Sequence, residues 1–381
     1  MSSCINLRLW LFVFSLATCS LSQDVAQRPG LAAAAAPERV SLSEVSAVEV
    51  PSLPAESIGA PLLCDPDGRV IFRMATPESG VEDPVSVSKD GKTVVRFGRE
   101  KISDVPSPVL ISIFLNRSDV YVLAAGTTRL GHQDKVLTRK GDTIVSEATR
   151  SSRYIAHFEP DGTYAGSVSL DLPFKPARLG VFENGDFLIA GAEPSTDEPR
   201  LAIVGSNGQF RRFVELKGDV HGQVESGASG KDKDPTALPR FGPPGTPSLF
   251  SAVSLSQIAK DGPNLLLFRP MNGPVFSISP SGEVTAHKLK VKGEYRLYTI
   301  KATRTSWIVE FLHDVPGSAA VELSTYAFDP ESGVPLREYF FPTDLGTGLA
   351  CTDGDEFTFV MANQKTNTLR LVTLAPAAKP N

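Results

Sequence analysis

No stretch after residue 38 shows a sustained apolar pattern of helical period, and this absence argues against a mainly helical fold. No apolar run after residue 22 reaches the roughly 20 residues that a membrane-spanning helix requires. The 38 basic and 43 acidic side chains give a net charge of −5, so no overall positive field attracts nucleic acid or anionic lipid. We therefore expect no membrane span in the mature chain and no nucleic-acid partner.

Motifs of catalytic and metal sites are also missing. The five histidines stand far apart, and the sequence contains no His-Glu-x-x-His, Cys-x-x-Cys or Gly-x-Ser-x-Gly motif. The segment 227–231 resembles part of a phosphate loop, but Glu225 stands where the leading glycine belongs and Asp232 where a magnesium-binding hydroxyl belongs, so we interpret it as linker. The motifs therefore predict no catalytic residue, no cofactor and no metal ligand.

The first 22 residues have the pattern of a signal peptide. Arg8 precedes the mostly apolar segment 9–21, and Ser20 and Ser22 are small residues at the −3 and −1 positions of a cut after residue 22. A second interpretation stays open, because residues 16–19 resemble a bacterial lipobox in which Cys19 would be acylated. Residues 23–37 are expected to be a flexible tether. The sequence thus predicts export to the periplasm or the extracellular space, as a secreted protein or a lipoprotein.

Short runs of β-branched and aromatic residues, bounded by glycine turns, predict an all-β fold. One set of turns joins an apolar strand to a more amphipathic one, at Gly91, Gly162, Gly208, Gly282 and Gly333. A second set precedes the most apolar runs, at Gly68, Gly185, Gly262 and Gly354, with residues 116–119 and 304–306 as glycine-free versions. Asp, Asn or Ser before Gly is typical of tight hairpins, because glycine supplies the positive φ.

The alternation of the two sets predicts a six-bladed β-propeller of four-stranded antiparallel blades, which occupies residues 38–376 as a single domain before a tail of 377–381. The second strand of a blade lies between neighbours and should be apolar on both faces. Five runs fit, at 120–125, 187–190, 265–268, 307–309 and 357–362. Two ordinary sandwich domains would also bury such strands and remain the alternative.

The last blade runs out of chain, because only residues 375–381 follow its third strand. An unpaired edge promotes aggregation. The apolar-rich segment from Val40 to Val50 precedes the first blade, so we expect it to supply the missing fourth strand and close the ring.

The third predicted blade, at 179–191 followed by 200–210, resembles the repeat pattern of six-bladed propellers of the NHL type. The likeness is one of pattern over residues 40–376, and the Asn-His-Arg segment of those repeats is absent. The resemblance implies a binding platform and carries over no catalytic residue.

Two cysteines remain in the mature chain, Cys64 and Cys351, each at the end of a blade's first strand. If the ring closes, their blades are neighbours, and an oxidising compartment would permit a disulfide between them. Two buried thiols are the alternative, because the first strands of adjacent blades can stand too far apart for a bridge.

Loop lengths place the long connections on one face, opposite the short turns. The connections are 126–152, 191–199, 217–250 and 313–320. Long loops on a rigid scaffold often bind partners. The first of them carries a local positive excess that includes Arg129, Arg139 and Lys140, with His132 beside them. Two interpretations stay open, a solvated charged loop and a loop that binds an acidic partner.

The sequence therefore favours a non-catalytic binding or scaffolding module whose partner is a protein or a polysaccharide. The alternative is a metal-dependent, lactonase-like hydrolase or a lyase with its site at the channel mouth, and only that alternative requires a divalent metal. Metal ligands are one interpretation of the acids at the first turns, Asp67, Asp261 and Asp353, but the turns themselves favour Asp before Gly, and we interpret these residues as turn residues.

Overall fold

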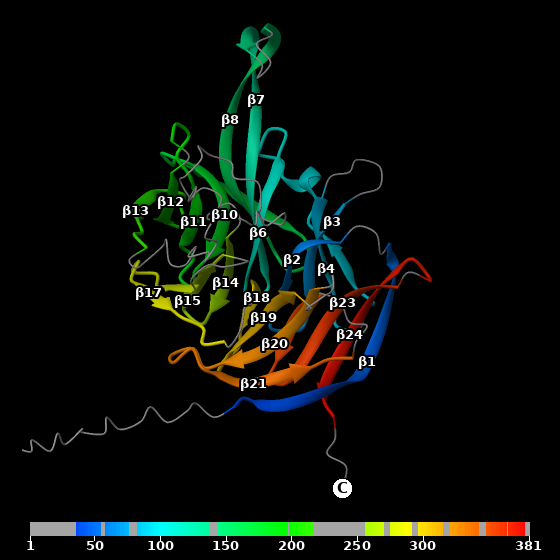
Figure 1. Cartoon of the computed structure of the whole chain (residues 1–381). Coiled ribbons are helices and arrows are strands. Elements are labelled where there is room, and N and C mark those ends of the chain that lie inside the picture. The colour runs from blue at the N-terminus through cyan, green and yellow to red at the C-terminus, as the bar shows by residue number, and fades with distance from the viewer. Residues whose placement is uncertain are drawn as a thin grey trace, which may run out of the picture. The chain divides into compact units, whose positions relative to one another are not determined.

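The computed structural model (Figure 1) describes residues 36–54, 58–75, 82–137, 143–196, 198–216, 256–269, 275–291, 296–314, 321–342, 348–363 and 365–377. For 54, 132–137, 143–147, 314 and 321 it describes only the backbone. The described residues form strands and one 3₁₀ turn, η2 (Arg99–Lys101), with no α-helix among them. Within this part of the chain no helix is long and apolar enough to cross a membrane.

Four separate sheets each contain four antiparallel strands in chain order, so each sheet is a meander. The first comprises β2 (Ile58–Cys64), β3 (Val70–Ala75), β4 (Glu82–Val87) and β5 (Val94–Arg96). The second comprises β6 (Val109–Asn116), β7 (Asp119–Leu137), β8 (Thr143–Phe158) and β9 (Tyr164–Leu170). The third comprises β10 (Lys175–Val181), β11 (Phe187–Ala192), β12 (Pro199–Val204) and β13 (Phe210–Phe213), and the fourth β14 (Gln257–Asp261), β15 (Asn264–Phe268), β16 (Val275–Ile278) and β17 (Val284–His287).

The fifth sheet has eight strands in the order β18-β19-β20-β21-β1-β24-β23-β22. One half is the meander β18 (Arg296–Ala302), β19 (Trp307–Asp314), β20 (Val321–Phe328) and β21 (Pro335–Phe340). The other half is β22 (Leu349–Asp353), β23 (Glu356–Asn363) and β24 (Thr368–Pro376), and β1 (Glu38–Pro54) joins the two. The described strands therefore form five sheets and not the six expected, because β1 bonds to both of its neighbours and joins the last two groups of strands into one sheet.

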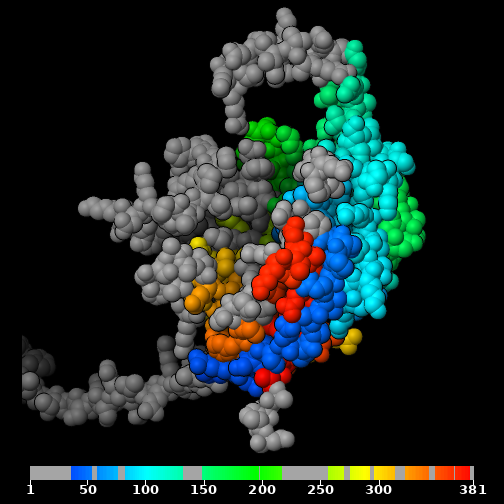
Figure 2. Space-filling model, turned by 90° about the vertical axis from the view of Figure 1, so that its right-hand side faces the viewer, coloured from blue at the N-terminus to red at the C-terminus, as the bar shows by residue number. Residues whose placement is uncertain are grey.

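The expected pairing of the N-terminal segment with the last strand is confirmed. Leu42 to Pro54 pairs antiparallel with β24, and Figure 2 shows the two strands side by side on the surface. The sequence did not predict the second contact, in which Glu38 to Ser41 pairs parallel with Arg337 to Phe340 of β21. Both edges of β1 are thus hydrogen-bonded, and neither β24 nor β21 is left as an open edge there.

The predicted turns are confirmed at every glycine named for them, each of which has a positive φ. At Gly208 (φ +81°), a Cβ atom would lie 2.1 Å from the backbone oxygen of Ser169, at the end of the preceding meander. At Gly91 (φ +70°), it would lie 2.5 Å from Val48 Cγ1 of β1. Each of these turns therefore packs closely against the outer strand of the unit before it, and β1 is that outer strand for the first meander.

The second strands form the core, as their apolar sequences predicted. Every residue of β11 is buried, and Leu265 to Phe268 of β15 are buried as well. Trp307 at the start of β19 is 1% exposed and packs with Phe268 and Val309. These contacts hold consecutive meanders face to face.

The prediction of a long loop over 126–152 was wrong. Pairing continues from Ala125↔Arg153 out to Leu137↔Thr143 with one register shift, so β7 and β8 form an extended hairpin that reaches beyond the other sheets (Figure 1). β-branched residues such as Thr127, Thr128 and Ile144 favour this strand pairing. The other expected connections lie partly or wholly outside the described residues: 217–250 entirely, and 313–320 apart from the end of β19.

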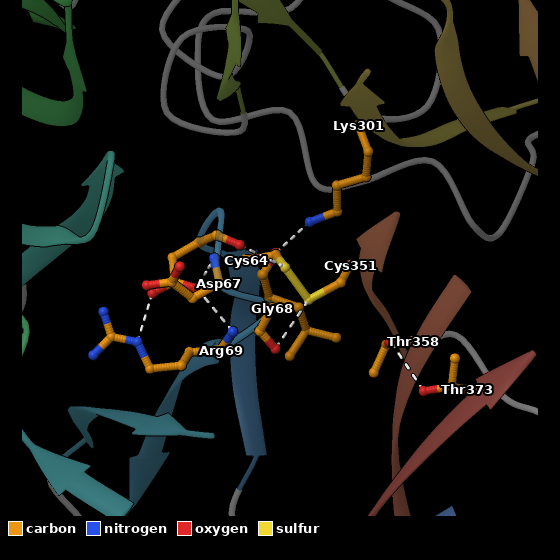
Figure 3. The surroundings of a disulfide bond; sticks show 10 residues. Cys64, Asp67, Gly68, Arg69, Lys301, Cys351, Thr358 and Thr373 are labelled. Atoms are coloured by element: carbon orange, nitrogen blue, oxygen red, sulfur yellow. Dashed lines mark hydrogen bonds and ion pairs between the residues drawn. A yellow bond between two sulfur atoms is a disulfide. The ribbon is translucent and has the colours of Figure 1, made fainter. Parts of the chain in front are cut away.

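A disulfide joins Cys64 at the end of β2 to Cys351 in β22, with Cα atoms 5.1 Å apart. Figure 3 shows the bond beside the first turn, where Cys351 Sγ lies 4.0 Å from the backbone oxygen of Gly68. It links two strands that are 287 residues apart in the sequence.

Candidate functional site

The first strands of the five meanders and strand β22 together line one cavity. β2 contacts β6 and β22, β10 contacts β6 and β14, and β14 contacts β18. Residues of all six strands line a cavity of about 790 Å³. Small-molecule sites in proteins usually occupy about 300–1,000 Å³. The cavity therefore has room for a ligand.

The lining carries more positive than negative charge. Five lining residues are basic and three are acidic. The basic residues are Arg73, Arg117, Arg178, Lys260 and Lys301, and the acidic residues are Asp65, Glu183 and Glu310. Asp65 is already paired, because Arg69 Nε lies 2.6 Å from its Oδ2 and its Oδ1 accepts hydrogen bonds from the backbone of Asp67 and Arg69. An anion therefore meets a favourable potential in this cavity.

Two arginines face the cavity from different meanders. Arg178 of β10 is held by hydrogen bonds from Nε to Ser256 O at 2.8 Å and from Nη1 to Ala177 O at 2.9 Å. Arg73 of β3 donates to Leu110 O at 3.4 Å, and its Nε lies 3.3 Å from Glu82 Oε2. Burial lowers the pKa of Arg178, and the charge of Arg73 lowers it further. The two like charges thus interact, and an anion bound nearby would relieve their repulsion.

Charged residues of the lining also lie near the turns that follow the first strands β6, β10 and β14. Lys260 Nζ donates to Asn116 Oδ1 at 2.5 Å and lies 3.8 Å from Glu183 Oε1. Burial lowers the pKa of Lys260, while Glu183 raises it and the charge of Arg117 lowers it. Glu183 is therefore partly neutralised by Lys260, and the positive excess of the lining remains.

Lys301 of β18 and Glu310 of β19 are two buried residues of the lining whose charges have opposite sign. The Lys301 ammonium donates to Leu62 O of β2, next to the disulfide (Figure 3). Glu310 is 0% exposed. Burial raises the pKa of Glu310 to about 8 against the attraction of Lys301, and burial lowers the pKa of Lys301 to about 8 against the attraction of Glu310.

Of the residues that the sequence proposed for partner binding, the structure describes the side chain of Arg129 alone, and it does not line this cavity. Arg129 is exposed on β7, opposite Thr149 of β8. His132 lies on β7 in the stretch whose side chains are not described, and Arg139 and Lys140 lie outside the described residues, as does Cys19. Their roles stay predictions.

Among the described residues, no three His, Cys, Asp or Glu side chains gather in a group that could hold a metal ion. Asp67, Asp261 and Asp353 stand at the first turns of different meanders, as the sequence placed them.

The sequence reasoning missed the charged residues of the cavity. A signal was present, because Glu310 follows the apolar run Trp307-Ile-Val within one buried strand, and Arg73 interrupts Val70-Ile-Phe in the same way. A charged side chain inside a strand that is otherwise apolar on both faces must pair or face a cavity.

The topology decides the fold class. Successive four-stranded meanders pack face to face around a cavity that their first strands line. The fold is an all-β propeller. No family model and no curated protein matches the chain.

Several solved structures resemble it. They include the β-propeller domain of the Trilobed protease from Pyrococcus furiosus, at 9% identity over 86% of this chain and 85% of that one, with a TM-score of 0.38. A member of the DUF4221 family from Bacteroides vulgatus has 8% identity over 90% and 100%, with a TM-score of 0.46. A protein of unknown function from Dyadobacter fermentans has 12% identity over 88% and 99%, with a TM-score of 0.43. At these identities the likeness concerns the fold alone.

Proposed function

We propose that this protein is an exported, six-bladed propeller that binds an anionic ligand in its central channel, the cavity lined by the first strands, without catalysing a reaction. The observation that carries the proposal is the basic lining of a cavity of about 790 Å³. Arginine and lysine side chains recognise carboxylate, sulfate and phosphate groups by charge-assisted hydrogen bonds. The ligand is either a small anion or the acidic end of a larger protein or polysaccharide partner.

Six blades follow if the eight-stranded sheet is counted as two. The pairing of β1 with β24 supports this count, because β1 then takes the place of a fourth strand after β22, β23 and β24. The packing of Gly91 against Val48 supports it too, since Gly208 meets the outer strand of the blade before it in the same way. The NHL-type resemblance remains a proposal at the level of repeat pattern.

Export is proposed from the signal-peptide pattern of residues 1–22. The adjacency of Cys64 and Cys351 supports it, because disulfides persist in oxidising compartments. The N-terminal mass of the mature protein distinguishes a cut after Ser22 from an acylated Cys19.

Two hypotheses from the sequence stay beside this one. Arg129, His132, Arg139 and Lys140 are still proposed to meet an acidic partner. A metal-dependent hydrolase or a lyase at the channel mouth also remains, and metal analysis of the purified protein tests it, since a stoichiometric divalent ion would favour the enzyme.

Calorimetric titration tests the channel directly. We expect cyclohexanecarboxylate to bind and its uncharged amide not to bind, with the affinity falling as NaCl is raised. Arg178→Gln and Arg73→Gln should each weaken binding about tenfold. Arg150→Gln, at an exposed position of β8 outside the cavity, is the matched control. Equal binding of acid and amide, or equal effects of all three substitutions, would refute the proposal.

A further inference from the structure

Glu310 is a fully buried carboxyl without a hydrogen-bond partner among the described residues. Both of its oxygens are buried and neither accepts a hydrogen bond, although the residue lines the channel. Its cross-strand neighbour Thr325 does not bond to it, and the Thr325 hydroxyl is also buried without a partner. Nearly all buried polar groups in proteins are hydrogen-bonded, so an orphaned carboxyl that faces a cavity points to a ligand.

The nearest charge does not satisfy Glu310 either. Lys301 attracts it, but the Lys301 ammonium is bonded to Leu62 O of β2, and no ion pair within 4 Å joins the two side chains. Because burial raises the pKa of Glu310 to about 8, its carboxyl is mostly protonated at pH 7 and both donates and accepts hydrogen bonds.

These neighbours select the group that Glu310 would bind. The positive charge of Lys301 repels an ammonium group, and a protonated carboxyl offers little attraction to a cation. A hydroxyl group, which both donates and accepts, matches the carboxyl in both roles. The same cavity presents Arg73 and Arg178 to a negative charge.

We propose that the channel ligand is a polyhydroxylated acid, of the chemical class of sugar acids, whose hydroxyl groups bond to Glu310 while its acidic group meets the arginines. This inference rests on the proposed function, because it names the class of anion that the channel takes.

Three probes separate the contributions to binding. D-glucuronate carries charge and hydroxyls, cyclohexanecarboxylate carries the charge on a ring without hydroxyls, and D-glucose carries hydroxyls without charge. By calorimetry at pH 7 we expect the wild-type protein to bind D-glucuronate about tenfold more tightly than cyclohexanecarboxylate, and D-glucose more weakly than either.

Glu310→Met removes the hydrogen-bonding group at nearly constant length, and Glu310→Gln keeps one. The methionine variant should lose about tenfold of the D-glucuronate affinity and none of the cyclohexanecarboxylate affinity. The glutamine variant should stay within a few-fold of wild type. Circular dichroism checks that both fold, and replacing a buried polar group by an apolar one of similar volume is usually tolerated.

The outcomes distinguish the two proposals. If neither acid binds, the proposed function fails. If both acids bind equally well, or if Glu310→Met weakens both alike, the channel binds anions but the hydroxyl subsite is refuted. Should the methionine variant not fold, Glu310→Asp replaces it, because the shorter carboxyl should still lose the preference for D-glucuronate.

Discussion

Cys64 and Cys351 lie near the two ends of the folded unit, in β2 and β22. Their bond closes a loop of nearly the whole domain, with a sequence separation of 287. A cross-link over so long a loop restricts the unfolded chain strongly, and it ties the first meander to strand β22 of the eight-stranded sheet.

We expect the protein purified under oxidising conditions to contain no alkylatable thiol at these two positions. The double substitution Cys64→Ser and Cys351→Ser should lower the free energy of unfolding by about 2–5 kcal/mol. Alkylation followed by intact mass measurement checks the first statement, and urea unfolding checks the second. Two alkylated cysteines in the untreated wild type would contradict both.

The Glu310 and Lys301 pair gives the stability a distinct pH dependence. The pKa of Glu310 rises from 4.5 to about 8 on folding, so between these values the folded state holds a proton that the unfolded state releases, and stability falls as pH rises. The pKa of Lys301 falls from 10.5 to about 8, so between pH 8 and 10.5 the unfolded state binds the extra proton and stability rises.

The substitution Glu310→Gln should remove the fall in stability that occurs as pH rises from 4.5 to about 8. Between pH 5 and 8 we expect the wild-type free energy of unfolding to drop by about 2–4 kcal/mol relative to this variant. Urea unfolding across the pH range is the measurement. Parallel profiles for the two proteins would exclude a buried carboxyl of raised pKa.

At this scale the sequence predicted turns better than sites. Asp-Gly and Asn-Gly pairs predict a positive φ from local sequence, so the turns at Gly68, Gly162 and Gly185 could be predicted from the residues alone. The role of Arg73, Arg178 and Glu310 depends on which strands meet at the cavity, and the arrangement of the sheets determines this. The sequence signal for these residues was a charged side chain within an otherwise apolar strand.

Among the turns, Gly208 and Gly262 form a matched pair for testing blade contacts. Both have positive φ, at +81° and +55°, so alanine is strained at either position. A Cβ at Gly208 would lie 2.1 Å from Ser169 O, while one at Gly262 meets nothing within 4 Å.

Gly208→Ala should therefore destabilise the protein by about 1–3 kcal/mol more than Gly262→Ala, because the added methyl forces neighbouring backbone apart. Thermal and urea unfolding of the two variants measure the difference. Equal losses would mean that this turn does not press on the preceding meander.

Strand β1 serves two neighbours, β24 and β21, through different parts of its length. Deleting residues 38–52 leaves both with an unpaired edge, so we expect loss of soluble, folded protein. Deleting the tether residues 23–35 is the control and should leave expression unchanged. A well-folded 38–52 deletion variant, judged by circular dichroism and gel filtration, would contradict this role of β1.

Element boundaries followed the sequence where apolar runs were short and bounded by turns, as in β11 and β15. They did not follow it in β7 and β8, because the charged residues of 126–152 indicated a loop, although β-branched residues such as Thr127, Thr128 and Ile144 favour strand pairing. The parallel pairing of Glu38 to Ser41 with β21 could not be predicted either, because tertiary structure and not local sequence pattern determines which strands pair when they are far apart in the chain.

At the scale of the whole molecule, closing the ring creates the channel. Each first strand alone presents an ordinary sheet edge, and together they enclose about 790 Å³ with a positive lining and one orphaned carboxyl.

A crystal structure of the protein soaked with D-glucuronate tests the central claim most directly. We expect density for the sugar acid inside the channel, with its carboxylate at Arg73 and Arg178 and a hydroxyl within hydrogen-bond distance of Glu310. Density for the sugar acid only on the outer surface, with the channel filled by solvent at a saturating concentration, would contradict it.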